Sequence, residues 1–478
     1  MLNTKLFKLL RRMSPEEMGR LRNYLSQRHK RSTQISRLFV YIDKYHPNFV
    51  GNKDKLTPEK VYTQVFKKSI YNKGQMQELT SRLLKEIQFF LITVEVEEND
   101  ILYDVLLNRA FKKRGMDDLF KLHNKSAQKK ILKNTILEQS HYDALFELSH
   151  EVTFHRDTKT LSTDYYEQLI ETERHLDAAY VLDKLKIICE RITLRGFVQT
   201  SESKSLLEVD YQSVVKKISS SFLLNLYLKV TELYEKDDPE IYHELKQQIT
   251  DSNHTISTEN RYTLVRFLIN YCSKKYKENT LVYTRELFNL YQFSEQNKLL
   301  IEDKYISEID YVNVVKIAVA VKEFKYAKRL IRYADYLKPE YRKNGHALAS
   351  AILHFGKKEY DEVKISLREI KWWDMNYKLT ARDLMLRTHY ESEDYKSLNN
   401  LMKTSLKNIE EDADMSEAKK EVNINFVNFI NQLMKHKMES TSPSEALSGQ
   451  LHEHPIVYIE WCQEKLLELQ GEAVSLLE

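Results

Sequence analysis

Glycine and proline are scarce in this chain of 478 residues, which has only 9 Gly and 7 Pro. Both are depleted roughly threefold relative to the usual composition of soluble proteins. Hairpins and β-bulges use glycine, and α/β nucleotide-binding folds need it where the backbone approaches phosphate. No two glycines have the spacing of a P-loop or of a dinucleotide-binding turn. The shortage therefore argues against sheet folds and against ATP- or NAD-dependent chemistry on a standard fold, and we expect no cofactor.

Cysteines and long apolar runs are also few or missing. Cys189, Cys272 and Cys462 are at least 83 residues apart, which fits neither a disulfide framework nor a zinc site and suits a reducing compartment. No run of 18 apolar residues is present. The first residues, MLNTKLFKLLRRM, have neither the apolar region nor the cleavage site of a signal peptide. We therefore expect a soluble, cytoplasmic protein that does not bind membranes.

Most of the prolines stand where a helix starts. Proline at the first helical position costs nothing, because its missing N–H would be unpaired there in any case. Four prolines directly follow a helix-capping residue, at Ser14-Pro15, Thr57-Pro58, Asp238-Pro239 and Ser442-Pro443. Apolar residues recur at helical spacing, and no segment alternates convincingly with period two. The sequence predicts an all-α protein, with its first helices near residues 3–12, 15–27, 33–45, 58–68 and 74–94.

Positive charge is concentrated at the N-terminus. Residues 1–90 carry 19 Lys and Arg against 7 Asp and Glu, a net charge of +12. Because the whole chain has a net charge of +4, the other 388 residues carry −8. The acidic run EVEEND (95–100) marks a junction. The predicted domains are a basic N-terminal helical module (1–97), degenerate helical-pair repeats (101–310), clearer repeats (311–408) and a C-terminal helical cap (417–478).

Three segments between residues 311 and 408 repeat at a spacing of 35 or 36 residues. An aromatic residue begins each second helix, and a smaller or apolar residue follows three positions later. The first copy also places a second alanine and a closing proline. These positions are Phe324, Tyr360 and Tyr395; Ala327, Val363 and Leu398; and Ala334 and Pro339. The pattern resembles the tetratricopeptide repeat, a helix pair of about 34 residues, and predicts an α-solenoid, a superhelix of antiparallel helix pairs.

Several landmarks are spread along the chain. They include KLTPEKVYTQVF (55–66), LDAAYVLDKLKIICERI (176–192), KEFKYAKRLI (322–331), KLTARDLMLRTHYE (378–391) and EWCQEKLLEL (460–469). Together they resemble an uncharacterised family of large helical proteins from Bacteroidota. The resemblance implies a cytoplasmic, all-helical protein of one architecture from end to end, and it brings no known activity and no functional residues.

No segment has the pattern of a catalytic or metal site. The histidines of HEVTFH (150–155) are five residues apart, about 140° around a helix, whereas His-Glu-x-x-His places two on one face. The segment HEHP (452–455) has no cysteine or carboxylate set around its histidines. Of Trp372 and Trp373, we expect one in the core between repeats and one at the surface, although the pair could also line a ligand groove. The three cysteines are expected to act as small apolar core residues.

The basic N-terminal module is the one place where a functional reading competes closely with a structural one. Its cations could form a surface that binds phosphates or an acidic partner. The helix 58–68, a turn at residues 72–74 and the following helix also resemble a helix-turn-helix, led by Gln75, Gln77, Thr80, Ser81 and Arg82. The alternatives are a solvated face, or a dock for the acidic repeats. The cations are Arg11, Arg12, Arg28, Lys30, Arg31, Lys67 and Lys68.

The leading hypothesis is a non-enzymatic helical-repeat scaffold that binds a protein or peptide partner, because stacked helix pairs offer a continuous surface for recognition. The alternative is a nucleic-acid-binding or regulatory protein that uses the basic module.

Overall fold

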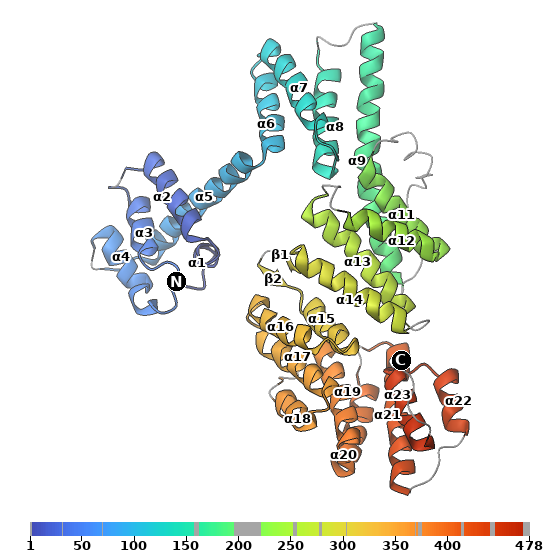
Figure 1. Cartoon of the computed structure of the whole chain (residues 1–478). Coiled ribbons are helices and arrows are strands. Elements are labelled where there is room, and N and C mark those ends of the chain that lie inside the picture. The colour runs from blue at the N-terminus through green and yellow to red at the C-terminus, as the bar shows by residue number, and fades with distance from the viewer. Residues whose placement is uncertain are drawn as a thin grey trace. The chain divides into compact units, whose positions relative to one another are not determined.

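The computed structural model describes most of the chain, and most of what it describes is helix (Figure 1). The described residues are 2–30, 32–68, 70–156, 162–195, 221–251, 256–276, 280–302, 304–368, 370, 375–412, 415–439 and 445–471. They form 22 α-helices, two short 3₁₀ segments and one hairpin of two-residue strands. The predicted all-α class is therefore confirmed across these residues.

The chain divides into two compact units. Unit 1 comprises Met1–Lys184 and Val209–Leu224, and unit 2 comprises Leu185–Glu208 and Asn225–Glu478. Helix α9 (Thr163–Arg195) belongs to unit 1 in its first part and to unit 2 in its last part. The four predicted domains subdivide the chain differently and stay predictions.

Unit 1 begins with helices that end close to their predicted bounds. The first is preceded by Thr4, and the second is capped by Ser14, whose hydroxyl accepts a hydrogen bond from the Glu17 N–H at 3.1 Å. The elements are α1 (Lys5–Leu10), α2 (Pro15–Arg28), α3 (Gln34–Asp43), η1 (Lys53–Lys55), α4 (Pro58–Phe66), α5 (Lys73–Glu98), α6 (Asp100–Lys113), α7 (Asp117–Leu132), α8 (Gln139–Thr153) and the first part of α9.

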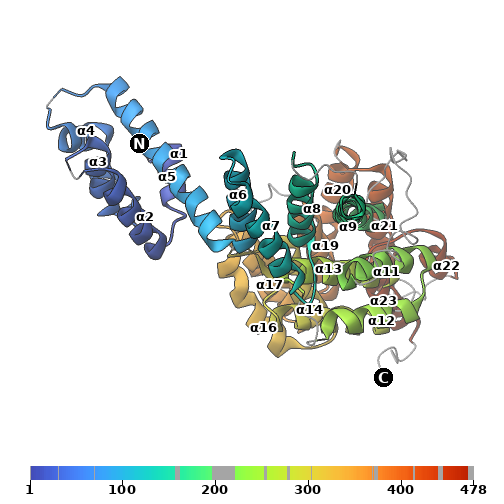
Figure 2. The ribbon, with the colours of Figure 1, turned by 90° about the horizontal axis from the view of Figure 1, so that it is seen from above.

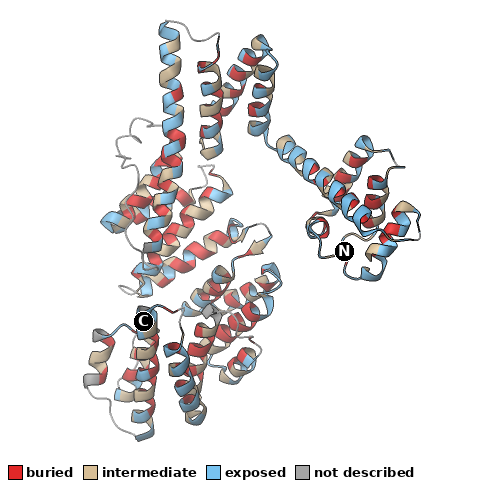
Figure 3. Cartoon of the chain, turned by 180° about the vertical axis from the view of Figure 1, so that it is seen from behind, coloured by how far each residue is buried: buried red, intermediate tan, exposed pale blue. Residues whose placement is uncertain are grey.

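The basic module has a core of its own around α5. One face of α5 carries Leu79, Leu83, Ile87 and Phe90, all buried in a cluster that extends from Leu6 to Phe90. Helices α1, α2 and α3 pack against α5, and α4 packs against α3 (Figures 1 and 2). The C-terminal part of α5 is largely exposed (Figure 3).

Helix α5 passes into α6 across a single residue. Asn99 caps α6, and its side-chain oxygen accepts a hydrogen bond from the Leu102 N–H at 2.9 Å. Helices α6, α7 and α8 then pack in succession, and α6 also contacts α8. Their small shared core includes Val105, Ala127 and Leu145.

Unit 2 is also mostly helical, and it contains the hairpin. Strands β1 (Ile301–Glu302) and β2 (Tyr305–Ile306) pair antiparallel. The helices are most of α11 (Phe222–Lys236), α12 (Pro239–Thr250), α13 (Thr258–Lys275), α14 (Thr280–Gln296), α15 (Glu308–Ala320), α16 (Phe324–Ile331), η2 (Arg332–Tyr336), α17 (Arg342–Gly356), α18 (Tyr360–Arg368), α19 (Met375–Glu391), α20 (Tyr395–Glu410), α21 (Glu417–Glu439), α22 (Glu445–Glu453) and α23 (Ile459–Gln470).

The three predicted copies in unit 2 share one turn geometry. Two residues before each aromatic residue the backbone is left-handed, with φ of 62° at Lys322, 63° at Lys358 and 56° at Glu393. The next N–H donates to the carbonyl oxygen five residues earlier, at 2.8, 2.9 and 2.9 Å in the pairs Glu323–Ala318, Glu359–His354 and Asp394–His389. Each aromatic residue then begins a helix and is half-buried, and three residues later come Ala327, Val363 and Leu398, all fully buried.

A fourth turn of the same kind joins α6 to α7 in unit 1. Gly115 has φ of 66°, and the Met116 N–H donates to the Phe111 carbonyl oxygen at 3.1 Å. Five residues after Gly115 lies Phe120, which is fully buried like its counterparts in unit 2. The sequence comparison missed this copy, because Asp117 stands at the aromatic position.

First helices of successive pairs also contact one another. Helix α15 packs against α16 and α17, and α17 packs against α18 and α19. The contact between α15 and α17 is close at Gly356, where an added Cβ would lie 2.3 Å from the Val319 Cγ1. In the first copy the second helix ends at Ile331 and tightens into η2, a common ending for a helix. Ala334 is buried within η2, and Pro339 lies exposed beyond it.

Candidate binding surfaces

The predicted basic surface comes from three places in unit 1. Arg11 and Arg12 follow α1, Arg28 ends α2 and Lys30 follows it, and Lys67 and Lys68 follow α4. All six side chains are exposed. Arg31 lies outside the described residues. No contact recorded for the described part of the chain joins the three places.

Part of the module's positive charge is paired internally. The Arg28 Nε lies 3.2 Å from the Glu86 Oε2, and its guanidinium lies 5.3 Å from the centre of the Tyr24 ring. Arg20 and Arg22 likewise pair with carboxylates. Among the described residues, no ion pair is found for Arg11, Arg12, Lys30, Lys67 and Lys68. These five cations are therefore available to an anionic partner.

In the helix-turn-helix-like segment, two of the five predicted residues make hydrogen bonds within the module and three are exposed on α5. Gln75 accepts a hydrogen bond from the Tyr62 hydroxyl at 2.7 Å, and the Thr80 hydroxyl donates to the Met76 carbonyl oxygen at 2.7 Å. Gln77, Ser81 and Arg82 are exposed on α5. Three of the five predicted positions could thus meet a ligand.

The histidines weighed as ligands have structural contacts. His155 is buried, with its Nε2 3.5 Å from the Asp117 Oδ1, and the His150 ring packs against Phe146 and Phe154. No group of three or more His, Cys, Asp or Glu residues in the described part could hold a metal ion. Trp372 and Trp373 and the side chain of His452 lie outside the described residues.

The three cysteines are buried and free. Burial raises the pKa of Cys272 and of Cys462 to about 12, and it raises the pKa of Cys189 as well. A nucleophilic cysteine needs the opposite shift, because the thiolate is the reactive form. Their environment agrees with the expected role as apolar core residues.

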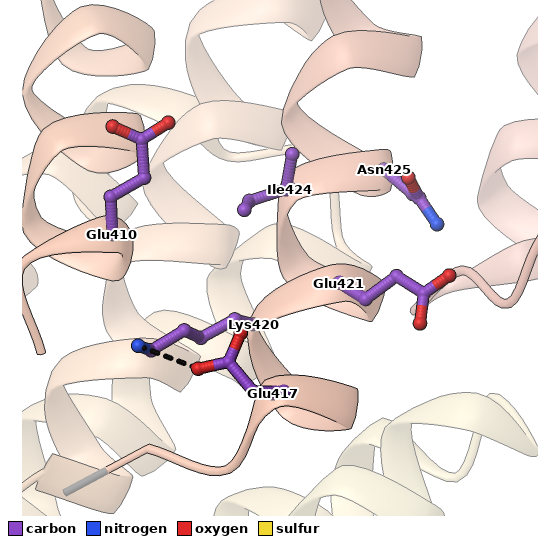
Figure 4. A pocket seen from close by; sticks show the side chains of 6 residues that line it. All are labelled: Glu410, Glu417, Lys420, Glu421, Ile424 and Asn425. Atoms are coloured by element: carbon purple, nitrogen blue, oxygen red, sulfur yellow. Dashed lines mark hydrogen bonds and ion pairs between the residues drawn. The ribbon is translucent and has the colours of Figure 1, made fainter. Parts of the chain in front are cut away.

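The surface pockets lined by described residues of unit 2 include two of several hundred Å³. The first, of about 360 Å³, lies between the end of α20 and the start of α21, and its six lining side chains are drawn in Figure 4. Lys420 is paired there with Glu417 at 3.0 Å, while the carboxylates of Glu410 and Glu421 point in different directions. The second, of about 530 Å³, includes Ala334 in its lining.

A cluster that the sequence did not predict lies where the first helices of the repeats meet residues 455–460. The ring of Tyr458 is close to two cations: the Arg387 Cζ is 3.9 Å from its centre and the Lys316 Nζ is 5.6 Å from it. The Arg387 Cζ is also 4.8 Å from the centre of the Phe355 ring. We call Lys316, Arg382, Asp383, Arg387 and Tyr458 the cationic cluster.

Three first helices supply this cluster and its surroundings. Lys316 lies on α15, Phe355 on α17 and Arg387 on α19. Lys316 and Arg387 each lie eight residues before the aromatic residue of their copy, so they occupy equivalent positions, and Ile352 takes that position in the copy between them. A comparison of equivalent positions across the copies was the one sequence signal that could have found the two cations.

The cluster holds one internal ion pair. The Arg382 Nη2 donates to the Asp383 Oδ1 at 2.8 Å and to the Asn423 Oδ1 at 2.9 Å. Burial raises the pKa of Asp383, although Arg382 opposes the shift. The Asp383 carboxylate is thus committed to Arg382.

Lys316 is both exposed and desolvated. Its side chain is accessible to solvent, yet burial by the surrounding protein lowers its pKa, and Arg387 lowers it further. The surrounding protein therefore displaces part of the hydration of the Lys316 ammonium, while the side chain stays accessible to solvent. Burial also raises the pKa of Tyr458 to about 12, with a further contribution from Asp383.

Tyr458 is held in an unusual backbone conformation. Its φ of 55° and ψ of 42° are left-handed, which costs a residue with a side chain about 1 to 2 kcal/mol. The Asn425 side chain donates to the Pro455 carbonyl oxygen at 3.0 Å, and Glu460 accepts hydrogen bonds at 2.9 Å from Tyr276 and Thr280. Neighbouring helices therefore fix the segment on both sides of Tyr458.

Comparisons of the chain with protein-family models, with curated proteins and with solved structures found no match. Among the described helices, none combines the length and the apolar character needed to cross a membrane.

Proposed function

We propose that this chain is a non-enzymatic, cytoplasmic helical-repeat protein, an α-solenoid of tetratricopeptide-like helix pairs that binds a protein or peptide partner. The observation that carries the proposal is the convergence of Lys316, Phe355 and Arg387 from three successive first helices. Repeat arrays align equivalent helix faces into one surface, and such surfaces recognise extended partners. The resemblance to a Bacteroidota helical family is consistent with the architecture and adds no activity.

The shared turn supports the repeat architecture. In the described residues, four turns that join two helices have a residue with left-handed backbone, followed by an N–H that donates to the carbonyl oxygen five residues earlier. Equal turns set equal angles between the helices of a pair, which is the condition for stacking pairs into an array. Two aromatic rings beside two cations then give the first-helix face the composition of a protein-binding surface, where aromatic residues and arginine are enriched.

A partner-capture experiment tests the proposal. We would purify bound proteins from the source cells with the wild-type chain, with the double variant Lys316→Glu and Arg387→Glu, and with the control Lys325→Glu and Arg332→Glu. The control residues are exposed cations of the first copy and its η2 segment. We expect a specific set of proteins that survives nuclease treatment, is kept by the control and is lost by the cluster variant. Identical capture by all three chains would contradict the proposed surface.

The second candidate function is nucleic-acid binding by unit 1. The observation that favours it is the set of five exposed cations without an ion pair in the described part of the module. Contacts to phosphate make the binding affinity fall steeply as salt is added. On duplex DNA, each phosphate contact steepens the fall of log affinity against log salt concentration by about 0.9. Titrating the full chain with duplex and single-stranded oligonucleotides between about 50 and 200 mM salt tests it.

Structure-based variants sharpen this second test. Reversing charge at Arg11, Arg12, Lys67 and Lys68 leaves the internal pairs intact, whereas reversing Arg28 breaks its pair with Glu86. We expect the four-site variant to lose affinity and salt dependence together, while the control Lys325→Glu and Arg332→Glu keeps both. If the wild-type chain does not bind at low salt, this candidate is wrong.

A further inference from the structure

The cationic cluster has more positive charge than its own carboxylates neutralise. Lys316 and Arg387 make no ion pair with any described residue. The Arg387 Nε donates only to the Asp383 carbonyl oxygen, at 3.4 Å, and the rest of its guanidinium lies against the rings of Tyr458 and Phe355. Two cations that lie close to the Tyr458 ring are therefore without a carboxylate partner among the described residues.

The carboxylates nearby are already engaged. Asp383 pairs with Arg382, and both oxygens of Glu460 accept hydrogen bonds, one from Tyr276 and one from Thr280. Asp383 and Glu460 influence Lys316 electrostatically and form no ion pair with it. Neither carboxylate can turn toward Lys316 without giving up its present hydrogen bonds, so the anion that would complete the cluster must come from elsewhere.

The geometry favours a small oxyanion over a larger polyanion. Guanidinium edges bind carboxylate and phosphate oxygens in pairs, and an ammonium adds up to three more donors. The two aromatic rings hold the Arg387 plane in place, so little rotamer freedom remains to be lost on binding. Lys316, Arg382 and Arg387 carry three positive charges. The nearby carboxylates of Asp383 and Glu460 carry two negative charges, which leaves a surplus of one positive charge. One anionic group balances that surplus, whereas a nucleic-acid backbone would meet the two carboxylates.

We propose that the first-helix face beside Tyr458 is a binding site for a single oxyanion, a carboxylate or a phosphate carried by the partner, held by the Lys316 ammonium and the Arg387 guanidinium. This inference rests on the proposed function, because the anionic group belongs to the peptide or protein that the array binds. Tyr458 forms the wall of the site, because its ring lies close to both cations.

Small anions test the site without the partner. We would measure the thermal unfolding midpoint and the binding heat of the full chain with inorganic phosphate and, separately, with acetate, each against sodium chloride at equal ionic strength. We expect saturable binding of at least one anion to the wild-type chain, and an affinity loss of tenfold or more in Lys316→Gln and in Arg387→Gln. Phosphate alone would indicate a phosphorylated partner, and acetate binding would indicate a carboxylate.

Two controls keep the result interpretable. Lys325→Gln and Arg332→Gln remove exposed cations outside the cluster and should leave anion binding unchanged. Arg387→Lys keeps the charge but loses the planar fork, so we expect weaker binding in a chain whose helical circular dichroism is unchanged. A second readout is the pKa of Lys316, followed by NMR in a chain with ¹³C-labelled lysine. The Lys316 signal is the one that disappears in Lys316→Gln. Its lowered pKa should rise when the anion binds.

The outcomes separate this inference from the proposed function. If neither anion binds the wild-type chain, or if binding persists in both cluster variants, the oxyanion site is wrong. If the Lys316→Glu and Arg387→Glu variant loses partner capture while small anions never bind, the face binds a partner without this site. If anions bind at the cluster but partner capture is unchanged in that variant, the site is present and the proposed partner surface is wrong.

Discussion

Glu295 of α14 and Arg329 of α16 form a double hydrogen bond, with distances of 2.6 Å from the Arg329 Nη1 to the Glu295 Oε1 and 2.8 Å from the Nη2 to the Oε2. The same carboxylate accepts hydrogen bonds from the hydroxyls of Tyr326 and Tyr333, at 2.7 and 2.8 Å. Glu295, whose side chain is largely buried, therefore links α16 and the η2 segment after it to α14. Polar residues that look like a solvated face in the sequence are partly a structural network.

Replacing Glu295 by glutamine should destabilise unit 2 by roughly 2 kcal/mol, because hydrogen bonds to a charged group are lost or weakened. Urea unfolding of the full chain measures this change. Burial by itself raises the pKa of Glu295, but the hydrogen bonds from Tyr326, Tyr333 and Arg329 outweigh it, so the pKa is lowered. The control Glu323→Gln alters an exposed carboxylate with no recorded side-chain bond and should change little.

The acid dependence of the same variant follows from the sign of the shift. A carboxyl whose pKa is lower in the folded state stabilises the fold above its unfolded pKa, about 4.3 for glutamate, and loses that effect as pH falls through the folded pKa. The difference in unfolding free energy between wild type and Glu295→Gln should therefore be constant near neutral pH and shrink below about pH 4. A difference that grows in acid would contradict the assigned network.

Gly356→Ala should destabilise unit 2 even though alanine favours helix by about 1 kcal/mol. An added Cβ would lie 2.3 Å from the Val319 Cγ1 and 3.2 Å from the Phe324 Cε1, so α17 could not approach α15 as closely. Overpacking of this kind costs roughly 1 to 3 kcal/mol. Gly19→Ala, in α2, is the matched control, because nothing lies within 4 Å of its added Cβ, and it should stabilise slightly. A gain in thermal stability at both positions would contradict the close helix contact.

The shared turn predicts opposite effects at equivalent positions. Lys322→Gly and Lys358→Gly should each stabilise by roughly 0.5 to 1 kcal/mol, because glycine adopts positive φ without steric cost. Gly115→Ala should destabilise by a similar amount, for conformational reasons alone, since its added Cβ would meet nothing within 4 Å. The thermal unfolding midpoint of each variant, compared with that of the wild-type chain, measures these changes in stability. The same sign at all three positions would mean that the four turns are not equivalent.

Local signals in the sequence predicted the helices well. The hydroxyls of Ser14 and Thr57 and the carboxylate of Asp238 cap the helices that their proline-containing dipeptides suggested. The helix predicted near 74–94 runs from Lys73 to Glu98. Each of these features depends on residues within one turn of each other, so it can be read without knowing the fold.

Contacts between distant segments could not be predicted in the same way. The copy at Gly115 was missed because its turn depends on backbone geometry, which Asp117 and Phe120 satisfy with side chains unlike those of the other copies. The cationic cluster joins Lys316 and Arg387 to Tyr458, which belongs to no repeat. Its position results from the path of the chain after α22, and periodicity carries no information about that path. The predicted basic surface stays a prediction.

The buried cysteines give the last prediction. At pH 8 a thiol with a pKa of about 12, as at Cys272 and Cys462, is about one ten-thousandth thiolate, so the native chain should not react with an aromatic disulfide reagent within minutes. Unfolding in guanidinium should release three reactive thiols. Because these pKa values are raised in the folded state, stability should also fall as pH rises above about 8.5, the unfolded value. Ser273→Cys, an exposed neighbour of Cys272, is the matched control and should react at once in the native chain. Rapid reaction of one thiol in the native wild-type chain would show an accessible cysteine and contradict the burial.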